Sequence, residues 1–267
     1  MSINLLSPNR ESDEPEKSNL TDASPKMEAS GANSNLSPKQ AWESIDFKRA
    51  QAEVARLQMR IAKAFKAGNR NKAKCLQGIL ARSFYARVLA VRRVSSNKGS
   101  RTPGIDGQLW KSPTRRYREA LALRKRGYKA LPLRRHYILK KNGKMRALGI
   151  PCMKYRAMQA LHALTLEPIA ESTADWNSYG FRRFRGTADA IEQAFTVLAR
   201  KDCAQWVLEG DIKACFDEIS HSWLLANIPM DKKLLAQWLD GLQPVRSSTD
   251  ELLRDAEKEP RSAREWG

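Results

Sequence analysis

The sequence predicts an α+β fold in which helices come first and a small amount of strand follows. Apolar residues recur at helical spacing from Val54 to Phe65. Alternating strands flank an Asn-Gly pair within residues 134–151, and the apolar run 205–212 has the composition of a buried strand. With 267 residues and 42% apolar content, the chain can bury the core of one or two domains.

The N-terminal part is predicted as a leader followed by helices. Residues 1–38 are rich in Ser, Asn, Pro and Glu and lack aromatic residues, so we expect a disordered leader. From Trp42 a first helical run reaches the Gly68-Asn69 break, and a second spans about 72 to 94. The glycine-rich segment 96–107 predicts a loop whose backbone closely approaches another group, which we expect to be phosphate.

The second half alternates helices, turns and strand. The Asn142-Gly143 pair suits a turn with positive φ, and Ser112-Pro113 suits the start of a helix. The expected elements are a helix from 113 to about 126, a hairpin over 134–151, a helix over 153–169, a loop over 178–186, a helix that Thr187 caps and that ends near 201, a buried strand over 205–212, and short helices from Ser222 and Asp231.

Charge is the strongest compositional signal. The net charge is +19, yet residues 1–40 hold 4 basic and 6 acidic residues and residues 241–267 hold 5 and 6, so the middle carries +22. A positive field of this density favours RNA or DNA as partner, although a solubilising surface is the simpler alternative. The cations that we expect to contact RNA are Arg92, Arg93, Lys98, Arg101 and Arg182.

The cysteines, the histidines and the hydropathy argue against disulfides, a zinc site and a membrane span. Cys75, Cys152, Cys203 and Cys215 form no CxxC pair and are expected to be small buried residues in a reducing compartment. The three histidines lack metal-ligand spacing, so no zinc site is predicted. No apolar run has the length of a membrane span and the N-terminus lacks a signal core, which predicts a cytoplasmic protein without a membrane partner.

Three features point to chemistry on phosphates. Asp211 ends the predicted strand, where a carboxylate can hold a divalent cation or cap a turn. Phe216 can belong to the core or form the wall of a nucleotide pocket. A cluster of cations surrounds the hairpin turn and can clamp a triphosphate or form a solvated tip; it consists of Lys140, Lys141, Lys144 and Arg146.

Four segments, in this order and at these spacings, resemble the multifunctional reverse transcriptases encoded by bacterial group II introns. They are RRVSSNKGSRTPGIDG, GYKALPLRRHYILKKNGKMRALGIP, NSYGFRR and WVLEGDIKACFDEISHSWLL. The resemblance covers about Trp42 to Leu239 and implies part of a right-hand polymerase fold. It implies a helical, RNA-binding N-terminal extension over 39–127 and the fingers and start of the palm over 128–239, leaving 240–267 as a divergent tail.

The resemblance also implies a role for each candidate site residue. Asp211 corresponds to the first catalytic, metal-binding aspartate, which holds Mg²⁺ beside the backbone carbonyl of Ile212. Phe216 packs under the sugar and excludes a 2′-hydroxyl, while Lys141 and Arg146 contact the incoming triphosphate. The implied partners are group II intron RNA and a DNA primer-template, with a homodimer or a complementing second chain as further candidates.

The sequence also departs from this family. Ala147, Arg183, Phe184 and Tyr155 replace a proline, a proline, a glycine and an aspartate of the usual pattern. The PQGG and Y-x-D-D motifs, which supply the other metal-binding aspartates, do not follow residue 239. We therefore expect a truncated reverse transcriptase/maturase that binds intron RNA without polymerase competence of its own. The alternatives are an RNA-binding maturase-like module that assists splicing and an inert relic.

Overall fold

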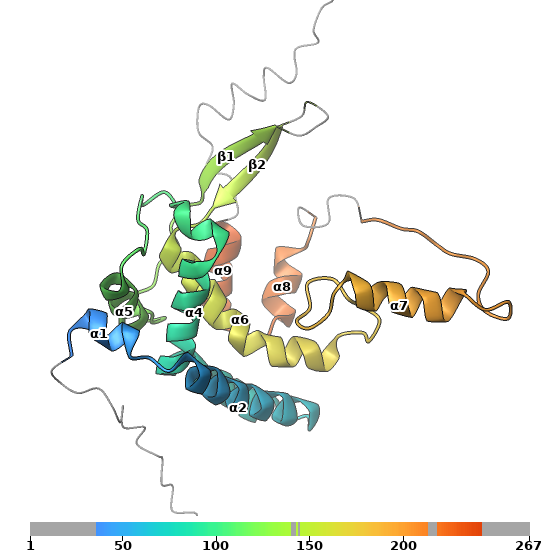
Figure 1. Ribbon diagram of the computed structural model, residues 1–267, viewed down its shortest axis with the longest axis horizontal. Coiled ribbons are helices and arrows are strands. Elements are labelled where there is room, and N and C mark those ends of the chain that lie inside the picture. The colour runs from blue at the N-terminus through green and yellow to red at the C-terminus, as the bar shows by residue number, and fades with distance from the viewer. Residues whose placement is uncertain (1–35, 140–142, 144, 213–217, 242–267) are drawn as a thin grey trace, which may run out of the picture. The chain divides into compact units, whose positions relative to one another are not determined.

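A computed structural model of the protein describes residues 36–139, 143, 145–212 and 218–241 (Figure 1). These residues form helices and one two-stranded antiparallel sheet, which agrees with the predicted α+β class. Apart from residues 36–38 and 240–241, the predicted leader and the predicted tail lie outside the described residues. The last residues assigned to the leader are ordered, because Ser37 caps the first helix, α1 (Pro38–Glu43).

The next helices are α2 (Phe47–Lys66), α3 (Arg70–Arg82) and α4 (Phe84–Ser96). Gly68, with φ of +74°, follows α2 and produces the predicted break. The prediction of one continuous helical run over 72–94 is wrong. Ser83 adopts an extended backbone, with φ of −61° and ψ of 135°, and this conformation separates α3 from α4.

Helix α5 (Pro113–Ala122) follows a short 3₁₀ helix, η1 (Lys98–Arg101). The Ser112 side chain accepts a hydrogen bond from the backbone N–H of Arg115, and Pro113 takes the first helical position, as predicted. The helix ends four residues earlier than expected. Leu123 leaves the helical conformation and is buried in the core, so the chain turns there.

The predicted hairpin is confirmed in strands β1 (Arg134–Leu139) and β2 (Met145–Ile150). Leu139 lies opposite Met145 in the last described pair of the hairpin, and residues 140–142 and 144 lie outside the described residues. Gly143 has φ of +77°, which matches the prediction of positive φ at the turn.

The later helices are α6 (Met153–Thr173), α7 (Thr187–Leu198), α8 (His221–Asn227) and α9 (Lys232–Asp240). Thr187 is the first residue of α7 and not its cap. The backbone N–H of Gly186 instead donates to the Asp189 carboxylate at 2.6 Å. Ser220 caps α8, two residues before the predicted start at Ser222, whereas Asp231 caps α9 as predicted.

The prediction of a buried strand over residues 205–212 is wrong. These residues are irregular and exposed, with Trp206 and Leu208 at 93% and 97% exposure. A strand forms only beside a hydrogen-bonded neighbour. Among the described residues the sheet consists of β1 and β2 alone, so this apolar run has no strand to pair with.

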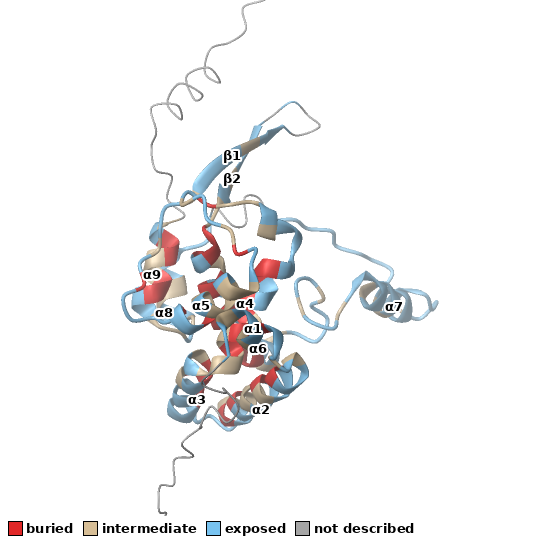
Figure 2. Ribbon diagram, turned by 60° about the vertical axis from the view of Figure 1, so that its left-hand side comes forward, coloured by how far each residue is buried: buried red, intermediate tan, exposed pale blue. Residues whose placement is uncertain are grey.

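The core lies between α2, α3, α4 and α6, and α9 joins it through Leu234 and Trp238. We call this group of five helices the helical core. In Figure 2 the residues coloured as buried gather in these helices, while α7 and the hairpin are mostly coloured as exposed. None of the described helices has the length and apolarity that a membrane crossing requires.

The expectation that the cysteines are buried is wrong for two of the three that are described. Cys152 is buried at the start of α6, but Cys75 is exposed and Cys203 is only half-buried. Cys75 lies on the outer face of α3, where helical spacing turns its side chain away from the core. All three are free thiols, and Cys215 lies outside the described residues.

Candidate functional site

The predicted catalytic residues lie on exposed parts of the chain. One oxygen of the Asp211 carboxylate accepts a hydrogen bond from the backbone N–H of Ile212 at 2.9 Å, and both residues are exposed. Arg146 lies in β2 opposite Ile138 and is also exposed. The predicted nucleotide-binding residues Lys141 and Phe216 lie outside the described residues.

Asp211 and Ile212 offer oxygen ligands of the kind that Mg²⁺ prefers, a carboxylate and a backbone carbonyl. Mg²⁺ takes an octahedral shell of six ligands, so these two oxygens leave most of the shell to water or to other groups. Within the described part of the chain, no cluster of three or more His, Cys, Asp or Glu side chains forms a metal site. Asp211 and Ile212 would therefore supply two of the ligands of a Mg²⁺ ion.

The N-terminal helices carry the densest positive charge. Residues 42–123 contain 19 basic and 5 acidic residues. Several of the acidic groups are already engaged. Asp46 caps α2, while Glu53 pairs with Arg56 at 3.2 Å and Glu119 pairs with Arg115 at 2.8 Å. These local contacts leave a strongly positive surface over α2 to α5.

Four of the predicted RNA-binding cations gather at the end of α4 and in η1. Arg93, Lys98 and Arg101 are exposed, so their charges are accessible to a phosphate backbone. Arg92 is also exposed, but its guanidinium lies over the ring of Phe47 in α2, 4.0 Å from the ring centre. Arg92 therefore joins α4 to α2 in addition to contributing charge.

Arg156 in α6 holds this cationic segment in place, and it was not among the site residues predicted from the sequence. Its guanidinium donates to the backbone carbonyls of Gly99 and Thr102, each at 2.7 Å, and to that of Pro151 at 2.8 Å. Burial lowers the pKa of Arg156, because the charged form loses solvation. A basic residue between buried Tyr155 and Ala157 is the sequence signal that could have revealed this role.

The glycine loop before α5 approaches the chain's own backbone. A Cβ atom at Gly104 would lie 2.4 Å from Cys152 Cα and 2.5 Å from its backbone nitrogen. Gly104 therefore has no room for a side chain, because it packs on the start of α6. The prediction that this loop closely approaches phosphate is wrong at Gly104, where the close partner is Cys152.

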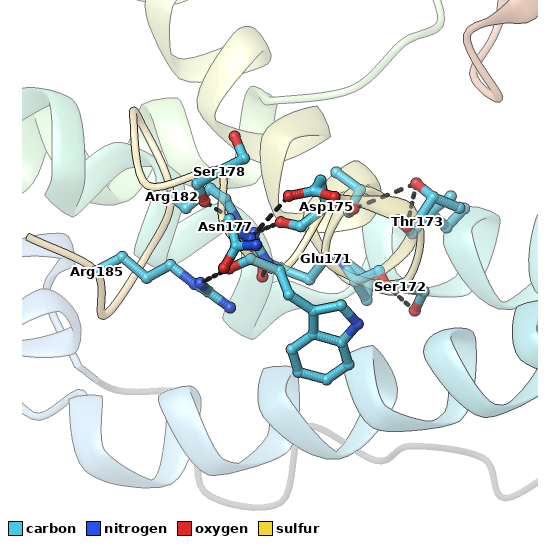
Figure 3. A network of polar contacts seen from close by, with 12 residues as sticks. Glu171, Ser172, Thr173, Asp175, Asn177, Ser178, Arg182 and Arg185 are labelled. Carbon is cyan, nitrogen blue, oxygen red and sulfur yellow. Dashed lines mark hydrogen bonds and ion pairs between the residues drawn. The ribbon is translucent and has the colours of Figure 1, made fainter. Parts of the chain in front are cut away.

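Arg182 organises the loop between α6 and α7, as Figure 3 shows. Its guanidinium donates to both carboxylate oxygens of Glu171, at 3.1 and 2.7 Å, and to the carbonyls of Asp175 and Ser178. The hydrogen bond from Arg182 lowers the pKa of Glu171 and stabilises its ionised form. Arg182 was predicted to contact RNA, and its donors are engaged within the protein.

The same loop presents exposed aromatic rings. Phe181 and Phe184 have φ of 60° and 57°, a left-handed conformation that is rare outside glycine. Both rings and that of Trp176 are solvent-exposed. Arg185 donates to the Trp176 carbonyl, and the Arg183 guanidinium lies 5.5 Å from the Phe184 ring centre. Exposed aromatic and Arg groups of this kind stack on unpaired bases.

Tyr155, one of the departures from the family pattern, is a core residue. It is buried, and its hydroxyl donates to the backbone carbonyl of Trp238 in α9 at 3.2 Å. The Trp238 indole N–H in turn donates to the Tyr128 hydroxyl at 3.3 Å. Burial raises the pKa of both phenols, that of Tyr128 to about 12, so both stay neutral; Tyr155 links α9 to α6, and Tyr128 links α9 to the segment after α5.

Comparison with known families gives two matches along the chain. Residues 42–123 match the family described as the N-terminal domain of reverse transcriptase. Residues 138–254 match the family described as reverse transcriptase (RNA-dependent DNA polymerase). The second match continues past residue 239, where the sequence alone set the end of the resemblance.

Curated relatives match about half of the chain. It is 38% identical over 145 residues to protein YkfC of Escherichia coli K12, covering 51% of this chain and 38% of YkfC. It is 36% identical over 148 residues to the group II intron-encoded protein LtrA of Lactococcus lactis, covering 54% of this chain and 24% of LtrA. An uncharacterized 91 kDa protein in the cob intron of Schizosaccharomyces pombe is 32% identical over 141 residues, covering 52% of this chain and 17% of that protein. The match spans well under half the length of each relative.

Proposed function

Because the chain belongs to the reverse transcriptase family, with intron-encoded proteins among its relatives, we propose that it binds group II intron RNA through its basic helices. In this proposal the protein acts as a maturase-like module that stabilises folded intron RNA. The concentration of charge in residues 42–123, which hold 19 basic and 5 acidic residues, carries the proposal.

We assign the described elements to part of a right-hand polymerase. The hairpin of β1 and β2 belongs to the fingers, where Lys141 and Arg146 would contact a triphosphate. Asp211 lies at the start of the palm and would be the first metal-binding aspartate. Phe216 would pack against the sugar of the incoming nucleotide, and the DNA primer would pair with its template beside it.

RNA binding tests this function directly. Wild-type protein should bind a structured group II intron RNA, and the affinity should fall steeply between about 50 and 200 mM salt, because neutralised phosphates release counterions. Replacing Arg93, Lys98 and Arg101 together by Gln should weaken binding about tenfold and reduce the salt slope. A matched control replaces Arg200, Lys201 and Lys233, which are exposed outside the proposed interface, and should change little. Binding that hardly responds to salt would contradict the proposal.

For polymerase activity we propose that a polypeptide of residues 1–267 does not extend a primer by itself. Two-metal phosphoryl transfer needs several carboxylates, and Asp211 contributes one exposed carboxylate. A second copy or a complementing chain would have to supply the remaining ligands. Primer extension with Mg²⁺ and dNTPs should be undetectable, and Asp211→Ala should change nothing. Extension that Asp211→Ala abolishes would show that the 267 residues build a complete site.

A further inference from the structure

A cavity of about 950 Å³ lies between α3, the start of α4, the segment that follows α5, α6 and the segment that joins α8 to α9. This volume is at the upper end of the range of about 300 to 1,000 Å³ that is typical of ligand pockets. None of the site residues predicted from the sequence lines it. We call it the basic cavity, because of the side chains at its rim.

The rim of the basic cavity is strongly cationic. On α3, Arg70, Lys74 and Arg82 share one face with Gly78, because the four positions are spaced by four residues. The segment after α5 adds a second row, Arg124 to Arg126. Eight Arg and Lys residues line the cavity in all, against one carboxylate, that of Asp231, which forms an ion pair with Lys125.

The interior below this rim is apolar and uncharged. It is formed by side chains of the core and its edge: Phe65, Leu123, Met158, Leu161, Ile169 and Met230. His162 also faces the cavity. Burial lowers the pKa of His162 to about 4, so its imidazole is neutral at neutral pH.

Three polar contacts fix the walls. The Gln77 side-chain amide donates to the carbonyl of Thr165 in α6 at 3.2 Å and to that of Pro229, between α8 and α9, at 3.0 Å. The ion pair of Lys125 with Asp231 joins the segment after α5 to the cap of α9. Because these contacts join the elements that form the walls, binding would require little ordering of the walls.

We propose that the basic cavity holds one unpaired nucleotide of single-stranded RNA, with the base against the apolar interior and the flanking phosphates against the Arg and Lys rim. The inference rests on the proposed RNA-binding function and locates where an unpaired base would bind. A cationic rim alone suits any polyanion. The apolar interior favours a polyanion with flat, weakly polar groups between its charges, which single-stranded RNA provides and a stacked duplex does not.

Obstruction of the cavity tests the role of the base. A Cβ atom at Gly78 would meet only the flexible guanidinium end of Arg82, at 3.4 Å, so a side chain can be added on the cavity side. Gly78→Trp should weaken binding of a fluorescein-labelled single-stranded RNA of about 12 nucleotides by about tenfold, because it excludes the stacked base. The matched control Gly78→Ala leaves the cavity open and should bind within about twofold of wild type.

Removal of charge tests the rim. Lys74→Gln with Arg126→Gln should also weaken binding about tenfold, whereas Arg200→Gln with Lys201→Gln, which are also exposed but lie outside the cavity, should bind like wild type. Both rim residues are exposed, so this variant is expected to fold. If Gly78→Trp does not fold, the rim variant tests whether RNA binds in the basic cavity. Thermal melts and circular dichroism check each variant.

The outcomes separate this inference from the function on which it rests. Wild type that binds no RNA would overturn both. Wild type that binds RNA, together with cavity variants that bind within about twofold of it, would overturn the cavity assignment alone. Affinity for an RNA duplex of equal length should not change in Gly78→Trp. In the last outcome, polyglutamate competes for binding as strongly as unlabelled single-stranded RNA does. This result would assign the cavity to an acidic peptide and overturn its assignment to a nucleotide.

Discussion

The helical core and the segment from α7 to residue 212 are both rich in apolar residues, and only the former buries them. Leu80, Val88 and Val91 are fully buried between helices, whereas Phe195 in α7 and Leu208 after it face solvent. The helices of the core present apolar faces to one another. An apolar sequence pattern therefore specifies which face of an element is apolar, while burial of that face requires a partner surface.

The two regions also differ in how their polar groups are used. In the helical core, buried polar side chains join helices to one another, as Gln77 does with α6. In the loop before α7, Arg182 and Arg185 bond to carbonyls within their own segment. Contacts of the first kind couple distant parts of the chain, so their loss should affect global stability, whereas loss of the second kind should act locally.

The largest expected loss of stability comes from truncating a fully buried side chain of the helical core. Leu80→Ala should destabilise the protein by about 3 kcal/mol, because it leaves a cavity at a side chain that is 0% exposed. Leu208→Ala should change the stability by less than about 0.5 kcal/mol, because the side chain is already in water. Denaturant unfolding followed by circular dichroism measures both. Equal losses would mean that Leu208 is buried in solution.

The pH dependence of stability gives a second test of burial in the helical core, because His162 belongs to it. Burial, with a smaller contribution from Lys125 and against attraction by Asp231, lowers the pKa of His162 from 6.5 to about 4. The unfolded state therefore binds the proton more readily. The contribution of His162 to stability should be constant well above pH 6.5 and should decrease by about 3 kcal/mol in total as the pH falls to 4.

Replacement of His162 isolates this contribution. His162→Leu keeps an apolar contact with Trp238 and cannot be protonated, so its stability should decrease less between pH 6.5 and 4. Burial raises the pKa of Asp231, but the hydrogen bonds from Lys125 and from the Leu234 backbone, together with the Lys125 and His162 charges, outweigh it and lower the pKa, so the effect of Asp231 lies below this window. The midpoints of urea unfolding of wild type and of His162→Leu, measured between pH 6.5 and 4, give the contribution of His162. Parallel curves would show that His162 is not buried.

Local signals in the sequence predicted most of the helix starts and the hairpin. Ser112 and Asp231 act through neighbouring backbone groups, and Gly143 adopts the positive φ expected of the turn, so these effects can be seen within a few residues. The family resemblance likewise depended on contiguous motifs and is confirmed by the matches over 42–123 and 138–254. Signals of this kind can be recognised in the sequence without knowledge of the tertiary structure.

Long-range contacts account for what the sequence did not predict. The roles of Arg156 and Gly104 depend on the approach of α6 to loops about fifty residues earlier, which no local pattern encodes. The strand over 205–212 was predicted from composition and has no partner among the described strands. The assignments of Asp211, Lys141 and Phe216 to a polymerase site rest on the resemblance and stay predictions.

A smaller effect is expected at the glycine loop. Gly104→Ala should cost about 2 kcal/mol, because the added Cβ would lie 2.4 Å from Cys152 Cα and the backbone must move. Gly180→Ala, in the loop before α7, has no atom within 4 Å of its added Cβ and should be close to neutral. Thermal unfolding compares the two. Equal melting temperatures would show that the loop does not pack on α6.

The smallest global effect is expected for Arg182. Its guanidinium bonds to Glu171 and to two carbonyls of its own loop, so Arg182→Gln should leave the global unfolding midpoint nearly unchanged. The loop should nevertheless open more often, and chymotrypsin should cut faster after Phe181 and Phe184, which are already exposed. Glu171→Gln should give the same increase because it weakens the same paired contact. Unchanged cleavage in both variants would mean that other contacts hold the left-handed conformation of the loop.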